Sequence, residues 1–134
     1  MHNKQIRREA KYFRLSPFKR ELSCTDHRIA ISLNGQIAVI DITDILYLKA
    51  DSNYTHIFLA DGSSMLTSVT LKRFEEKLNP TQFIRTHSGF LVQNNMIKSY
   101  DHKLNKILLS NQTEIPVARS RKDEVMGIFR KMMI

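Results

Sequence analysis

Short runs of alternating apolar and polar residues, separated by turn residues, are the feature of this sequence that most restricts its fold. Ile29, Ile31 and Leu33 alternate with polar or small residues, Asn34-Gly35 follows, and a second alternating run begins at Ile37. Alternation places apolar side chains on one face of a strand, and Asn-Gly between two such runs is a strong signal for a β-hairpin. The sequence therefore predicts a hairpin here and a protein built mainly from antiparallel strands.

The same pattern continues through most of the chain. Runs rich in β-branched and aromatic residues predict further strands at residues 45–50, 54–59, 63–68, 83–85, 90–92, 97–100, 106–109 and 114–117. Asp61-Gly62 and the polar stretches around 101–105 and 111–112 supply the turns between them. We therefore expect a mainly β fold whose later strands form a hairpin or a meander.

Two segments show helical spacing instead. Leu71, Phe74 and Leu78 follow Thr70, a candidate hydroxyl cap, and predict a short internal helix that ends at Asn79-Pro80. Near the C-terminus, Ser120 is the candidate cap of a closing helix that we expect to pack on the sheets. The apolar face of that helix is expected to carry Val125, Ile128, Phe129 and Met132.

Basic residues outnumber acidic ones and gather at the start of the chain. Lys and Arg number 21 against 13 Asp and Glu, which gives a formal net charge of +8. Residues 1–28 contain eight of the cations and the three acidic residues Glu9, Glu21 and Asp26, so eight minus three leaves +5 there. This excess favours an anionic partner, either nucleic acid or an acidic membrane surface. The stretch before Ser16-Pro17 fits a short helix, and a mobile basic tail is the alternative.

Several classes of protein are disfavoured by what the sequence lacks. No run approaches the roughly 18 apolar residues of a membrane span and the N-terminus has no apolar signal core, so we expect a cytoplasmic protein without a membrane partner. The single cysteine, Cys24, excludes an internal disulfide and is expected to be an ordinary thiol. The five histidines have no HExxH spacing, so we expect neither a metal site nor a cofactor. Without a nucleophile elbow, a Gly-rich phosphate loop or an acidic dyad, neither an enzyme nor a small-molecule substrate is expected.

Three segments, in order along the chain, match a known family in residue type and spacing. They are DILYLKADSNY from Asp44 to Tyr54, FIRTHSGFLV from Phe83 to Val92, and IPVAR from Ile115 to Arg119. With these segments the chain resembles the LytTR (LytR/AgrA-type) DNA-binding domain of bacterial transcription regulators, over about residues 28 to 134. We therefore expect a LytTR-like domain at 28–134 and, outside the resemblance, a basic N-terminal extension at 1–27 that is flexible or partly helical.

The resemblance implies both a fold and a mode of binding. The fold is a β-β-β sandwich of antiparallel sheets that lies across successive major grooves of double-stranded DNA, with loop residues inserted toward the base edges. Carried over residue by residue, the family's DNA contacts fall on His56, on His87 with Ser88, and on Arg119. The sequence departs from the family's pattern at Ser88-Gly89 and at Gln93, where Asn94 or Asn95 would have to compensate.

The chemistry of these residues and their neighbours leaves more than one role open. Arg119 could donate to guanine or to a phosphate, and otherwise forms a surface ion pair; Arg121 and Lys122, at a helix start, bind phosphate or stay solvated. His87 could donate to a phosphate or a base, and His56 is available if Ile57 and Leu59 enter the core. Asn53 and Tyr54 are further DNA-binding candidates; the alternatives are a turn residue and a half-buried packing residue.

The leading function is sequence-specific binding of duplex DNA by a transcription regulator, with a footprint of repeated short half-sites. Binding as a homodimer or in tandem on direct repeats fits such a footprint. Family members usually carry a receiver domain of two-component systems in front, for which 27 residues leave no room, so we expect a stand-alone DNA-binding unit or a piece of a larger protein. The alternatives are a protein interaction module that binds a sensor or another regulator, and a single-strand binder that uses Tyr47, Tyr54 and Phe58.

Overall fold

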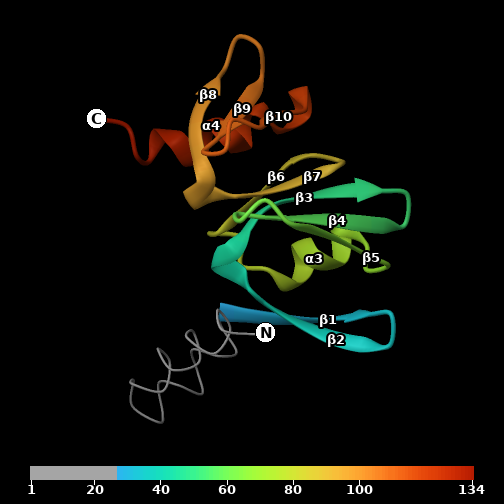
Figure 1. Cartoon of the computed structure of the whole chain (residues 1–134). Coiled ribbons are helices and arrows are strands. Elements are labelled where there is room, and N and C mark those ends of the chain that lie inside the picture. The colour runs from blue at the N-terminus through green and yellow to red at the C-terminus, as the bar shows by residue number, and fades with distance from the viewer. Residues whose placement is uncertain (1–26) are drawn as a thin grey trace, which may run out of the picture. The chain divides into compact units, whose positions relative to one another are not determined.

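The structure is a computed structural model that describes residues 27–134 (Figure 1). The chain divides into two compact units, Met1–Thr43 and Asp44–Ile134. The predicted N-terminal helix or tail and the Cys24 thiol lie outside the described residues. The boundary between residues 27 and 28 that the sequence suggests stays a prediction.

A β-hairpin makes up the described part of the first unit. Strand β1 (Arg28–Leu33) pairs antiparallel with β2 (Gln36–Asp41), and Leu33 lies opposite Gln36. Asn34 and Gly35 connect the strands with φ values of 49° and 81°, the left-handed conformation that a two-residue hairpin turn of the type I′ class requires. The Asn-Gly prediction is therefore confirmed. The 3₁₀ turn Ile42–Asp44 (η1) follows the hairpin.

The second unit is organised around a five-stranded antiparallel sheet with the order β5-β4-β3-β7-β6. Consecutive strands are joined by tight turns, except where a helix connects β5 to β6. The strands are β3 (Ile45–Asp51), β4 (Tyr54–Leu59), β5 (Ser64–Thr67), β6 (Phe83–His87) and β7 (Phe90–Gln93). Every one of them was expected from the sequence, with small differences at the ends.

One face of this sheet is covered by the internal helix α3 (Leu71–Lys77). The Thr70 hydroxyl accepts a hydrogen bond from the Arg73 amide at 3.3 Å, which confirms the predicted cap. Leu71 and Phe74 of the helix are buried, and the helix contacts β3 and β7. On the sheet, Leu48 and its register partner Leu91 are buried on this α3 face. Burial of these apolar side chains holds the helix on the sheet.

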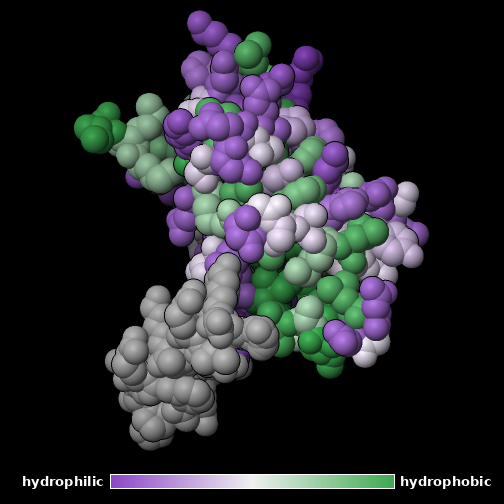
Figure 2. Space-filling view, in the orientation of Figure 1, coloured by the Kyte–Doolittle hydropathy of each residue, from purple (hydrophilic) through white to green (hydrophobic). Residues whose placement is uncertain are grey.

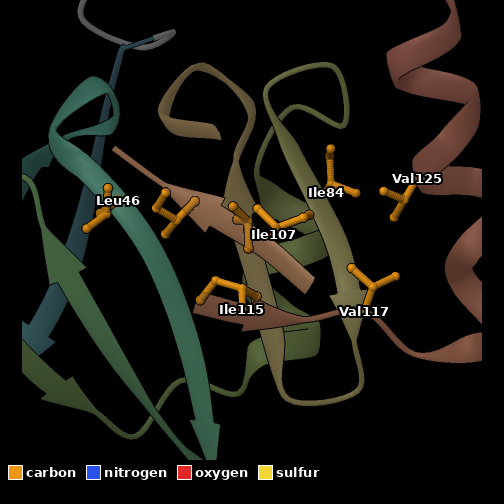
Figure 3. Packing of buried hydrophobic residues seen from close by; sticks show 8 residues of the cluster. Leu46, Ile84, Ile107, Ile115, Val117 and Val125 are labelled. Carbon is orange, nitrogen blue, oxygen red and sulfur yellow. The ribbon is translucent and has the colours of Figure 1, made fainter. Parts of the chain in front are cut away.

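The opposite face of the sheet carries a hydrophobic core cluster, shown in Figure 3. Ile84 and Val92 are register partners on this face, and Val92 is also opposite Tyr47, the neighbour of Leu48. They pack against a three-stranded antiparallel sheet of order β10-β9-β8, and against the C-terminal helix through Val125. The elements are η2 (Asn94–Met96), β8 (Ile97–Asp101), β9 (Lys106–Leu109), β10 (Glu114–Pro116), the 3₁₀ turn η3 (Arg119–Arg121) and helix α4 (Lys122–Arg130).

Two details of the predicted closing helix are wrong. Ser120 is not its cap, because the chain first makes the 3₁₀ turn η3, and Arg121 then occupies the cap position without a side-chain hydrogen bond. Met132 is not on the packed face, because α4 ends at Arg130 and Met132 is 65% exposed beyond it. Figure 2 shows this hydrophobic C-terminal end at the surface. Val125, by contrast, is fully buried as expected.

The mainly β class, the antiparallel sheets and the two helices agree with the fold expected from the sequence. The second unit has three layers, with α3 on one side of the five-stranded sheet and the three-stranded sheet with α4 on the other. Among residues 27–134, no helix has both the length and the apolar character needed to span a membrane.

Candidate nucleic-acid interface

Three segments that contain the candidate DNA-binding residues meet at one end of the five-stranded sheet. The β3–β4 turn lies beside the β6–β7 loop, because the Ala50 amide donates to the Gly89 carbonyl at 2.9 Å. The segment that enters η3 joins β6 at the same end, because the Ala118 amide donates to the Thr86 carbonyl at 2.8 Å. Backbone hydrogen bonds therefore hold the three segments next to one another.

A β-bulge in β6 decides on which face His87 lies. Arg85 is the register partner of Leu91, and the next residue to pair is His87, opposite Phe90, so Thr86 is an extra residue between two pairs. Without the bulge, regular alternation would place His87 on the α3 face together with Arg85. With the bulge, His87 shares the opposite face with Phe90.

The two candidate histidines consequently lie on one face and in one cross-strand row. Register pairs connect His56 of β4 to Lys49 of β3, Lys49 to Phe90 of β7, and Phe90 to His87 of β6. Three strand spacings of about 4.8 Å separate the histidines by about 14 Å. Lys49, between them, is exposed, and its Nζ lies 5.8 Å from the centre of the Phe90 ring. Sequence reasoning did not select Lys49, because its place between the histidines depends on strand order.

His56 is half-exposed and contacts an acidic residue at the end of the neighbouring strand. Its Nε2 lies 3.3 Å from Oδ2 of Asp51, and the two side chains are 35% and 63% exposed. His56 was expected to be available if Ile57 and Leu59 enter the core. Ile57, on the other face, is fully buried and Leu59 is half-buried, so this condition is met at Ile57 and in part at Leu59. An exposed pair of this kind is weak, and the imidazole can exchange Asp51 for another partner.

His87 is held in a defined orientation. The Gly89 amide donates a hydrogen bond to Nδ1 of His87 at 3.1 Å, and the ring stands edge-on to Phe90 with centres 5.9 Å apart. A backbone N–H can only donate, so Nδ1 acts as the acceptor and the neutral ring carries its proton on Nε2. The imidazole therefore offers Nε2–H as a donor, suited to a phosphate oxygen or a base acceptor.

Aromatic rings support the row of histidines from within the sheet. Tyr47 stacks on Phe58 with ring centres 4.5 Å apart and lies 6.2 Å from Phe90, while His56 is 6.0 Å from Phe58. Burial raises the pKa of the Tyr47 phenol above its usual value, because the ionised form is disfavoured away from water. The aromatic rings thus pack against one another and against the imidazole of His56.

Arg85 connects the β6–β7 loop to helix α3. Its Nε donates to the His87 carbonyl at 3.0 Å, its Nη2 donates to the Ser88 carbonyl at 2.6 Å, and its Nη1 contacts Oε1 of Glu75 at 2.6 Å. The Arg85 side chain is only 13% exposed. Sequence reasoning missed this residue, because Glu75 belongs to another element and no local spacing indicates the contact.

The three cations at the start of α4, Arg119, Arg121 and Lys122, differ in burial and in how many contacts their side chains make within the protein. Arg119 is exposed, and within residues 27–134 its side chain has no hydrogen-bonded or ionic partner. Arg121 is partly engaged, with Nη1 3.4 Å from the Arg85 carbonyl and 3.8 Å from Oε1 of Glu124. Lys122 begins α4 and is half-buried. Of these three cations, Arg119 is thus the one most available to a ligand.

The remaining candidates lie at the turns. Asn53 and Ser88 are exposed, and Tyr54 is 49% exposed at the start of β4. The family departure at Gln93 has a structural role here, because this buried side chain donates from Nε2 to the Ile45 carbonyl at 2.9 Å. The side chain of Asn94 donates to the Thr81 carbonyl at 2.8 Å, away from the loop. Neither amide therefore extends the interface.

A metal-binding arrangement was not expected from the sequence. Among the described residues, no group of three or more His, Cys, Asp or Glu side chains is placed to hold an ion.

The sequence model of the LytTr DNA-binding domain matches residues 35–130. The chain belongs to the LytTR family. Its solved relatives include the LytTr DNA-binding domain of a methyl-accepting/DNA response regulator from Bacillus cereus, which aligns with a TM-score of 0.64 at 24% identity. That alignment covers 77% of this chain and 96% of the solved chain. At this level of identity the likeness establishes the fold, and the family match carries the assignment to a DNA-binding domain.

Curated relatives match most of this chain with about half of their own length or less. The sensory transduction protein LytT of Bacillus subtilis is 29% identical over 102 residues, which are 74% of this chain and 42% of LytT. The CO-responsive transcriptional regulator RcoM of Rhodospirillum rubrum is 24% identical, over 75% of this chain and 44% of RcoM. A sensory transduction protein LytR of Staphylococcus saprophyticus is 27% identical, over 84% and 44%. This LytTR chain spans less than half the length of these three relatives.

Proposed function

We propose that this chain binds double-stranded DNA in a sequence-specific manner as part of a transcription regulator. The observation that carries the proposal is the meeting of three segments at one sheet end, where His56, His87 and Arg119 are each exposed or half-exposed. Membership of a family of DNA-binding domains supports it. An edge made of turns and loops fits readout of successive major grooves, because each turn can enter a groove while the strands between them face phosphates.

In this proposal the side chains divide into base readers and phosphate ligands. Arg119 and His87 are the main base readers, since one offers a free guanidinium and the other a fixed Nε2–H. Lys49 and Lys122 bind phosphates, with a weaker contribution from Arg121 because Glu124 lies close to it. The remaining contacts at the turns come from Asn53, Tyr54, His56 and Ser88.

The wider setting follows from the same proposal. The protein acts by binding and not by catalysis, without a cofactor or a small-molecule substrate, and it works in the bacterial cytoplasm, where the DNA lies. The relatives named sensory transduction proteins support a role downstream of a sensor, as in two-component systems. Direct repeats in the target would bind copies of the chain in tandem or as a homodimer.

Selection from random duplexes, followed by binding measurements at several salt concentrations, tests the proposal. Arg119→Ala should weaken binding to the selected duplex about five- to 150-fold, as expected for loss of a contact worth about 1–3 kcal/mol. Its thermal stability should stay unchanged, because Arg119 has no side-chain partner within the described residues. Arg73→Ala is the matched control, since Arg73 is exposed on α3, which covers the opposite face of the sheet.

The outcome that would overturn the proposal is equally specific. If no duplex is enriched and the chain still captures a protein partner after nuclease treatment, the chain is an interaction module. Equal affinities for Arg119→Ala and the wild-type chain would remove Arg119 from the interface.

A further inference from the structure

The guanidinium of Arg85 uses all three of its nitrogen atoms on the protein itself. Two of them hold consecutive carbonyl groups of the β6–β7 loop, those of His87 and Ser88, at 3.0 and 2.6 Å. The third contacts the Glu75 carboxylate at 2.6 Å. Planar guanidinium groups are suited to such simultaneous contacts, which a lysine cannot reproduce. The group therefore fixes the loop backbone with respect to α3.

Arg85 acts on the loop from the face opposite to the one that carries His87. Its side chain shares the α3 face with Leu91, while the Thr86 bulge turns His87 to the other face. The Arg85 side chain is 13% exposed and Glu75 is 40% exposed. A guanidinium that is 13% exposed and has these contacts is poorly placed to bind a phosphate. It instead holds the backbone of His87 and Ser88, which are better placed to contact DNA.

The orientation of His87 depends on the loop backbone that Arg85 holds. Nδ1 of His87 accepts from the amide of Gly89, the residue directly after the Ser88 carbonyl that Arg85 binds. If the loop shifts, this hydrogen bond lengthens, and the imidazole loses the contact that keeps its proton on Nε2. The Arg85 contacts and the His87 tautomer are therefore linked through one short stretch of backbone.

We infer that Arg85, anchored by Glu75, is a positioning residue that fixes the orientation and tautomer of His87, so that Nε2–H faces a hydrogen-bond acceptor on DNA. The inference rests on the proposed function for the identity of that acceptor, a phosphate oxygen or a purine N7 or O6. A loop fixed before binding avoids the cost of ordering it in the complex. Arg85 and Glu75 thereby raise sequence-specific affinity without touching DNA.

The first experiment needs no DNA. In the free wild-type chain, long-range nitrogen–proton correlation spectra should show a single His87 tautomer with the proton on Nε2. Arg85→Lys should convert this signal to a mixture of tautomers, and Glu75→Gln, a milder change on an exposed side chain, should shift it in the same direction. Arg73→Lys and Glu76→Gln are matched controls on the same helix and should leave it unchanged. An unchanged His87 signal in Arg85→Lys and Glu75→Gln would overturn the inference.

The second experiment measures affinity for the selected duplex and for an unrelated duplex. Arg85→Lys should weaken specific binding about two- to tenfold, the cost of immobilising one or two side chains. Binding to the unrelated duplex and the slope of affinity against salt should not change. If Arg85 instead binds a phosphate, Arg85→Gln should reduce the magnitude of that slope by about 0.9, and the inference fails. If Arg85→Lys does not fold, Glu75→Gln provides the same test, because it changes an exposed side chain. Glu75→Gln should give a smaller loss in specific binding than Arg85→Lys.

The two proposals can fail separately. If the wild-type chain binds no duplex, the proposed function fails, and the tautomer spectra alone decide whether Arg85 positions His87. If the wild-type chain binds specifically, and Arg85→Lys and Glu75→Gln both bind the selected duplex as tightly as the wild-type chain, the proposed function stands and the positioning role is overturned.

Discussion

The β6–β7 loop and the β3–β4 turn lie side by side in this protein, and the residues that the structure describes hold them differently. Hydrogen bonds from the Arg85 side chain fix the loop, whereas the tip of the turn is exposed. In the loop, Arg85 holds two carbonyls and the Gly89 amide holds the ring of His87. In the turn, Ser52 and Asn53 are exposed, and Ser52 has a left-handed φ of 56°. The contact between Asp51 and His56 at 3.3 Å lies next to this turn and is largely exposed.

Because the loop is held by side chains and the turn is exposed, the two regions should bind a ligand at different entropic cost. A side chain in a fixed loop can bind without losing much further conformational freedom, whereas a side chain on a loosely held turn is ordered during binding. Each ordered side chain costs about 0.5–1.5 kcal/mol, which offsets part of the contact it makes. We therefore expect the β6–β7 loop to contribute most of the specificity and the β3–β4 turn to adapt.

The largest expected difference is between alanine variants of the two regions. His87→Ala should weaken binding to the selected duplex about fivefold or more, because it removes a hydrogen bond worth about 1–3 kcal/mol from a fixed site. Asn53→Ala should cost only about threefold, because ordering its side chain offsets part of the gain. Fluorescence anisotropy titrations with both variants measure these losses. A larger loss for Asn53→Ala than for His87→Ala would reverse the comparison.

Two buried threonines, one in each region, give a comparison in stability. Thr86 and Thr55 are both fully buried, but the Thr55 hydroxyl donates to the Val69 carbonyl at 2.7 Å, whereas Oγ1 of Thr86 has no hydrogen-bond partner within residues 27–134. Thr86→Val should raise the free energy of unfolding by about 1 kcal/mol, because it removes an unpaired buried hydroxyl. Thr55→Val should lower it by about 1 kcal/mol. Urea unfolding measures both changes, and a loss of stability in Thr86→Val would contradict this explanation.

The smallest expected effect concerns the acidic residue beside the β3–β4 turn. Asp51→Asn removes a negative charge from the proposed DNA edge and releases His56 from its exposed contact. Binding to the selected duplex should tighten about twofold at low salt, and the gain should disappear at high salt because exposed charges are screened. Asp101→Asn, an exposed acidic residue on β8, is the control. Weaker binding by Asp51→Asn would show that the Asp51–His56 pair orders the turn.

Local signals in the sequence predicted much of this fold. Asn34-Gly35 specified the first hairpin, and Thr70 with Leu71 and Phe74 specified α3, because a turn and a capped helix depend on neighbouring residues. The predicted cap of α4 was wrong, because a prediction from neighbouring residues does not include contacts that are distant in sequence. The hydrogen bond between the Ala118 amide and the Thr86 carbonyl, a contact distant in sequence, holds the segment that then makes a 3₁₀ turn instead of the predicted cap.

The arrangement of the candidate site was less accessible. The resemblance to LytTR indicated His56, His87 and Arg119, but not the bulge at Thr86 that turns His87 to the face of His56. A bulge inserts one residue without a fixed sequence signal. The contact between Arg85 and Glu75 was also hidden, because it joins a strand to a helix and depends on how the helix packs.

The most direct test of the account is a titration of the nitrogen-15-labelled chain with the selected duplex, followed by amide chemical shifts. We expect the largest changes at residues 51–56, 86–89 and 118–122, with little change on the exposed side of α3. Changes concentrated on α3 or on the β1–β2 hairpin, with those three segments silent, would contradict the claim that they form one DNA-binding edge.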